Sequence, residues 1–212
     1  MREARDGTPL PSQSTRQRDC SEAVIRDSGR VVILGEAPAR PRPGGSSQAG
    51  EGPLGGRTGR FLRSLTGDLD YAAFEARWEP LNLLREWPGR PPGGGKGSYL
   101  PPEAAFRSLE GIWTRLDGRV LVTLGARVRS LVLRLWAPEA PVPAWFAWSS
   151  RPEGQKGPAA WAAIPHPSGL SRVWNSRRAR EEGARTLEEA RNRARAGSGF
   201  PLDDRRRAET GF

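Results

Sequence analysis

Short apolar runs recur along the middle of the chain, each long enough for one buried strand. Three of them are continuous and rich in aliphatic residues, which is typical of parallel strands covered on both faces. The remaining run is less regular. We therefore expect strands at residues 30–35, 79–84, 119–125 and 161–164.

Between these runs, apolar residues return every three or four positions, which is the spacing of one face of a helix. The clearest stripe joins Phe106, Leu109, Ile112, Trp113 and Leu116, and it follows a proline pair suited to the start of a helix. We expect helices at residues 57–66, 71–77, 101–116, 128–132 and 176–196.

The order of these elements predicts the fold class. Strands alternate with helices along the chain, which favours a parallel sheet with helices on both faces. We expect an α/β fold, a three-layer α/β/α sandwich around a central four-stranded, mainly parallel sheet. In such folds the loops after the strands form the ligand crevice. Glu36, Asn82 and His166 each lie at the end of an expected strand, so we expect them to face one crevice.

Length and composition favour one domain with loose ends. A chain of 212 residues suits a single core, but an apolar fraction of 36% with 26 Gly and 20 Pro indicates that part of it does not pack. We expect a disordered tail at residues 1–28, a domain at 29–196 and a second disordered tail at 197–212.

The net charge of +10 favours a polyanionic partner, because clustered cations gain affinity by releasing counterions from phosphates. A second explanation stays open. Lys96 and Lys156 are the only lysines among 34 basic residues, and a GC-rich genome would produce this preference for arginine whatever the function.

Cysteine usage and hydropathy narrow the class of protein. Cys20 is the only cysteine, which excludes an intramolecular disulfide and a cysteine-ligated cluster. The chain has no apolar stretch of signal-peptide length at its start and no apolar run of about 18 residues or more. We expect a soluble, intracellular protein that does not bind a membrane.

Three segments in order along the chain resemble the uracil-DNA glycosylase superfamily. They are GEAP at 35–38, GPLGGRTG at 52–59 and HPSGLSR at 166–172, and LNLL at 81–84 with RPP at 90–92 fits the same pattern. The resemblance covers roughly residues 30–195. It implies a DNA-binding domain that acts on a base flipped out of the helix. The iron-sulfur cluster of many similar proteins is not implied, since its cysteine ligands are missing.

The resemblance assigns roles to residues that contact the base. His166 would hydrogen-bond the departing pyrimidine and stabilise its negative charge, and Glu36 would position or activate water. Asn82 would read the pyrimidine edge, beside Leu54, Ala37 and Pro38. Each residue also has a structural interpretation that stays open. His166 can be a packed histidine, Glu36 a structural carboxylate, and Asn82 an asparagine that caps a turn.

The HPSGLSR segment would also hold the DNA. Leu170 would enter the base stack as a wedge when the base leaves, although a loop leucine can instead pack inward. Ser168, Gly169, Ser171 and Arg172 would contact the strand, with Ser168 and Arg172 on phosphates.

Departures from the family pattern bear on the substrate. Leu54 stands where an aromatic residue usually stacks on uracil, Ala37 where some branches have Asp or Asn, and Ala39 where a Tyr excludes thymine. We expect a monomeric, nucleoid-associated DNA glycosylase without metal or cofactor, acting on uracil or a related pyrimidine. A non-catalytic or modified-base DNA-binding module, and an enzyme for small nucleotides, are the alternatives.

Overall fold

The computed structural model describes residues 30–38, 40, 52–90, 93, 99–167 and 171–197, and every structural statement below concerns these residues. The strands are β1 (Val31–Gly35), β2 (Trp78–Asn82), β3 (Val120–Leu124), β4 (Trp148–Ser150) and β5 (Ala160–Ile164). The helices are α1 (Arg57–Thr66), α2 (Tyr71–Arg77), α3 (Pro102–Trp113), α4 (Ala126–Trp136) and α5 (Arg177–Gly197), with 3-10 turns η2 (Thr114–Leu116) and η3 (Arg172–Asn175). Most of the tails expected to be disordered lies outside the described residues, but Gly197 belongs to α5.

The expected α/β class is confirmed, and the expected strand count is wrong. Five strands form one sheet in the order β2-β1-β3-β5-β4. All neighbouring pairs are parallel except β4 and β5, which are antiparallel. The sequence WSS of β4 has no apolar run and only three residues, so its pairing with β5 gives little signal in the sequence.

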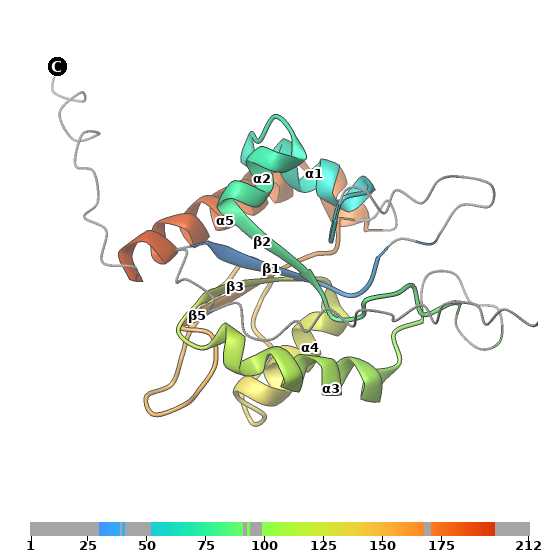
Figure 1. Ribbon diagram of the computed structural model, residues 1–212. Coiled ribbons are helices and arrows are strands. Elements are labelled where there is room, and N and C mark those ends of the chain that lie inside the picture. Colours follow the sequence, from blue (N-terminus) through green and yellow to red (C-terminus); the bar gives the residue numbers. More distant parts are fainter. Residues whose placement is uncertain are drawn as a thin grey trace, which may run out of the picture.

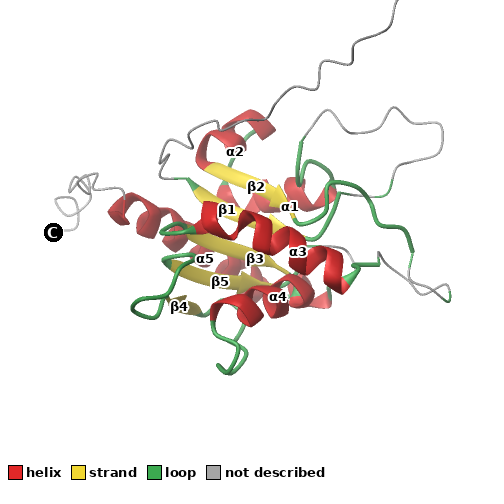
Figure 2. Ribbon diagram, turned by 60° about the horizontal axis from the view of Figure 1, so that its bottom comes forward, coloured by secondary structure: helices red, strands yellow, loops and turns green. Residues whose placement is uncertain are grey.

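Helices cover both faces of the sheet (Figure 1). The views in Figures 1 and 2 place α1, α2 and α5 on one face and α3 and α4 on the other. Alternate residues of β1 face the two layers: Val32 and Leu34 pack in the core with α3 and α4, whereas Val31 and Ile33 pack with the other three helices. All five residues of β1 are buried, which explains its unbroken apolar sequence.

β2 lies at an edge of the sheet, and its sequence fits that position. Pro80 has no N–H for a ladder hydrogen bond and is therefore tolerated at an edge, where it stands opposite Ile33 of β1. The pairing continues beyond the strand ends. The N–H of Leu83 donates to the carbonyl of Gly35, and the N–H of Leu84 donates to that of Glu36. These bonds fix the backbone just after β1.

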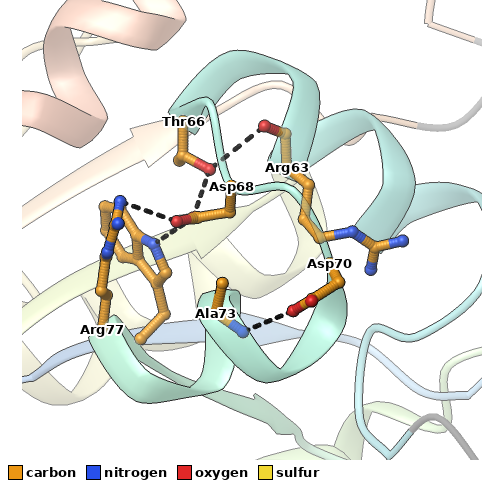
Figure 3. Close-up of polar contacts among 7 residues, drawn as sticks. Arg63, Thr66, Asp68, Asp70, Ala73 and Arg77 are labelled. Atoms are coloured by element: carbon orange, nitrogen blue, oxygen red, sulfur yellow. Dashed lines mark hydrogen bonds and ion pairs between the residues drawn. The ribbon is translucent and has the colours of Figure 1, made fainter.

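A buried carboxylate holds the connection between α1 and α2 (Figure 3). Asp68 Oδ2 accepts from Thr66 Oγ1 at 2.6 Å and from Trp78 Nε1 at 3.0 Å, and Arg77 Nη1 lies 2.8 Å from Asp68 Oδ1. Asp70 then caps α2 by accepting from the N–H of Ala73. The network ties the two helices to the first residue of β2, at the amino end of that strand. The candidate site described below lies at the carboxyl ends of the strands.

Candidate active site at the carboxyl edge of the sheet

The candidate site lies where successive strands of the chain are added to opposite sides of β1. β1 lies between β2 and β3, so the connection after β1 leads to one neighbour and the connection after β2 crosses to the other. The carboxyl ends of β1 and β3 at such a switch point are the usual ligand position in open α/β sheets. Glu36 follows β1, and the first turn of α4 follows β3.

Glu36 is held by an arginine of that turn. Arg127 Nη2 lies 2.6 Å from Glu36 Oε2, and Arg127 Nε donates to Glu36 Oε1 at 3.0 Å, so both carboxylate oxygens are engaged. The Glu36 side chain is 11% exposed and that of Arg127 is 49% exposed. Burial raises the pKa of the Glu36 carboxyl, and the charge and hydrogen bond of Arg127 oppose that rise.

His166 packs against the same turn of α4. Gly125, the residue before α4, has φ of 89°, and a Cβ built on it would lie 3.1 Å from the Cβ of His166. This approach requires glycine, because a side chain would meet the histidine and strain the left-handed backbone. Burial lowers the pKa of His166, and the positive charge of Arg127 lowers it further. Both effects favour the neutral ring, which has one N–H to donate.

Trp174 fixes the backbone that carries His166. Its indole Nε1 donates to the carbonyl oxygens of Pro165 and His166, both at 3.2 Å. The ring packs edge-on against Phe61 of α1 and Phe146, with centroid distances of 5.0 and 5.8 Å. A Cβ on Gly183 of α5 would lie 2.7 Å from the ring. Trp174 thus joins the loop after β5 to one helical layer.

Asn82 and Leu54 meet above Gly35. A Cβ on Gly35 would lie 2.8 Å from Asn82 Oδ1 and 2.7 Å from Leu54 Cδ2, so any larger residue would displace these two side chains. Leu54 is buried in a turn with φ of 62°, and its carbonyl lies against Gly59 of α1. Asn82 Oδ1 is buried and has no hydrogen-bond partner among the described residues. Such an acceptor costs roughly 1–3 kcal/mol, and a ligand that donates a hydrogen bond would recover it.

The structure brings Glu36, His166, Asn82 and Leu54 to one edge of the sheet. Ala37 and Pro38 follow Glu36 and are half-buried. Ser171 is half-buried just before η3, and Arg172 is exposed within it. The interpretations of Ser168, Gly169, Leu170 and Ala39 lie outside the described residues.

Sequence reasoning missed Arg127, Gly125 and Trp174. The rule that drew attention to residues after strands 30–35 and 161–164 applies equally to the strand at 119–125, which ends at Gly125 and is followed by Ala126 and Arg127. Arg127 and Gly125 were therefore accessible to the same argument. Trp174 was not, since nothing in the spacing indicates where its ring packs.

We looked among the described residues for a metal site, a membrane-spanning helix and a second pocket. These residues contain no group of three or more His, Cys, Asp and Glu side chains suited to a metal ion. None of their helices is long and apolar enough to cross a bilayer. A surface hollow of about 380 Å³ lies between α5 and residues 145–147, but its polar residues already pair with one another or with neighbours on α5.

Comparisons with known proteins add no family assignment. No protein-family model matches the chain, and no curated protein shows significant similarity to it. The case for a function therefore depends on the residues and their geometry.

Proposed function

We propose that this protein is a DNA glycosylase-like hydrolase, which cleaves the N-glycosidic bond of uracil or a related or modified pyrimidine flipped out of DNA. The observation that carries the proposal is the convergence of Glu36 and His166 on the first turn of α4 at the switch point of the sheet. The Asn82 Oδ1 acceptor at the same edge has no hydrogen-bond partner among the described residues, which supports a ligand with a hydrogen-bond donor, such as the N3–H of a pyrimidine.

The proposed reaction needs no metal or cofactor. The bond between C1′ and the base nitrogen breaks with its electron pair on the base, and a water oxygen forms the new bond to C1′. His166, neutral, donates to a carbonyl oxygen of the departing base, where negative charge develops. Glu36 orients the water and accepts its proton, and the released base is protonated by solvent.

One observation favours a binding module as the second candidate. Both oxygens of Glu36 are already engaged by Arg127, which leaves the carboxylate a weaker base toward water. Leu54 packs on Gly35 in place of an aromatic stacking surface. Both features suit a site that holds a modified base without cleaving it.

A cleavage assay tests the proposed function. Purified protein is incubated with labelled single- and double-stranded oligonucleotides that contain uracil, hydroxymethyluracil or hypoxanthine, and alkali then reveals abasic sites. We expect strand breaks at a modified pyrimidine. Binding of a modified duplex with no abasic product would support the binding module, and neither binding nor cleavage would contradict both candidates.

The proposed partner is DNA inside the cell, at the nucleoid, bound by a monomer. Arg172 on η3 and Arg177 and Arg178 at the start of α5 follow the His166 loop along the chain and are exposed. Arg177 and Arg178 form ion pairs on the surface of α5, which leaves Arg172 as the best candidate for a phosphate contact. Because each phosphate contact contributes about 0.9 to the slope of log affinity against log salt, we expect affinity to fall steeply with salt.

The salt dependence is checked by fluorescence anisotropy with a labelled duplex. Arg172→Gln should weaken binding and reduce the slope by about one. Arg134→Gln, in the α4 layer with its guanidinium over the Phe106 ring, is the matched control and should leave the slope unchanged. Affinity that stays constant between low and physiological salt would favour genomic bias as the source of the positive charge.

A further inference from the structure

Resting on the proposed function, we propose that Arg127 is a positioning residue of this site, whose guanidinium fork aims the Glu36 carboxylate and whose charge acts on His166. No motif of the sequence marks it. It stands in the first turn of α4, between the end of β1 and the loop after β5.

The first step is geometric. A carboxylate bound at one oxygen can rotate, whereas two parallel hydrogen bonds from Nε and Nη2 fix its plane. The backbone of Glu36 is also fixed, since its carbonyl accepts from the N–H of Leu84. Together these contacts hold the carboxylate of Glu36 in its observed orientation at the carboxyl edge of the sheet.

The second step is electrostatic. His166 packs on Gly125, two residues before Arg127, and the positive charge of Arg127 lowers the pKa of the imidazole. Among the described residues, the charged group recorded as acting on His166 is Arg127 of α4, which is itself paired with Glu36 after β1. η3 contributes the uncharged indole of Trp174, which bonds the backbone. The positive charge of Arg127 thus disfavours protonation of His166.

Removal of the arginine charge should move both titrations in one direction. Without a positive neighbour, the protonated forms of His166 and Glu36 are each easier to form, so both pKa values rise. If protonation of these groups stops cleavage, the acid limb of the rate profile moves to higher pH.

The decisive variants are Arg127→Gln, which removes fork and charge, and Arg127→Lys, which keeps the charge alone. His166 is the only histidine in the chain, so NMR follows its titration without overlap from other histidines. We expect the pKa of His166 to rise in Arg127→Gln and to stay near the wild-type value in Arg127→Lys. Cleavage should slow roughly 10- to 100-fold in both, since misaligned groups lose this much.

Controls separate positioning from stability. Arg134→Gln makes the same change at the far end of α4, over the ring of Phe106, and should alter neither the titration nor the rate. The pair Glu36→Gln with Arg127→Gln removes both charges at once, so no buried carboxylate is left unpaired. In the Glu36→Gln background, at a pH above the titration of His166, Arg127→Gln should have little further effect on the rate.

The outcomes distinguish this inference from the proposed function. If the wild type cleaves nothing, the glycosylase proposal fails, and the His166 titration still decides whether Arg127 acts on the site. An unchanged pKa of His166 in Arg127→Gln overturns the electrostatic step. Cleavage by Arg127→Gln at the wild-type rate overturns the positioning step. The same conclusion follows if Arg127→Gln slows cleavage equally in the wild type and in the Glu36→Gln variant.

Discussion

His166→Ala is expected to slow release of the base by about 10²- to 10³-fold and to leave DNA affinity nearly unchanged. The ring acts on charge that develops only as the glycosidic bond breaks, so its loss affects the transition state more than the bound ground state. Single-turnover cleavage with enzyme in excess measures the chemical step directly. Binding to the same oligonucleotide is measured separately by anisotropy.

Two comparisons make the His166 result interpretable. His166→Gln keeps an N–H donor on a chain of similar reach and should recover part of the lost rate. Val173→Ala, at a 43% exposed residue of the neighbouring η3, should leave the rate unchanged. Cleavage by His166→Ala at the wild-type rate would rule out the proposed role of His166.

Trp174→Ala is expected to lower the free energy of unfolding by about 3–5 kcal/mol, the usual cost of truncating a buried aromatic residue. The ring is 6% exposed and packs between α1, α5 and Phe146, so its removal leaves a cavity at the junction of three segments. Urea unfolding followed by circular dichroism gives the value, with Val173→Ala as the exposed neighbouring control.

Trp174→Phe separates packing from hydrogen bonding at this position. It keeps most of the ring and removes the N–H that donates to the carbonyls of Pro165 and His166. We expect a smaller loss of stability, roughly 1–3 kcal/mol, since two acceptors lose their partner. A stability equal to the wild type would show that the indole N–H does not hold the loop.

Elements with strong local signals were predicted from the sequence to within a residue or two. The α1 and α2 boundaries agree with the expected ones because glycine and aspartate mark them: Gly67 ends α1 in a left-handed conformation, and Asp70 caps α2. β1 was clear because both of its faces are buried. β4 was missed because its pairing partner β5, and not its own composition, makes it a strand.

The site was predicted less completely than the fold. Glu36, Asn82 and His166 could be placed at strand ends because parallel strands share a carboxyl edge. The same rule would have placed Arg127 at this edge, but its pairing with Glu36 could not be deduced, because the side-chain contact depends on how the ends of β1 and β3 lie side by side. The contact of Leu54 with Gly35 depends on how the turn at 52–55 folds back, and sequence spacing does not report such a contact.

The strand order also affects how this chain folds. Parallel neighbours in the sheet are always separated along the chain by at least one helix, so the pairings of β1 with β3 and of β3 with β5 are non-local contacts. Such topologies fold more slowly than helical bundles, because loop closure comes before the stabilising contacts. During synthesis, Glu36 emerges long before His166, and Trp174 emerges later still. We therefore expect the two halves of the site to meet only late in folding, once the last strand has joined the sheet.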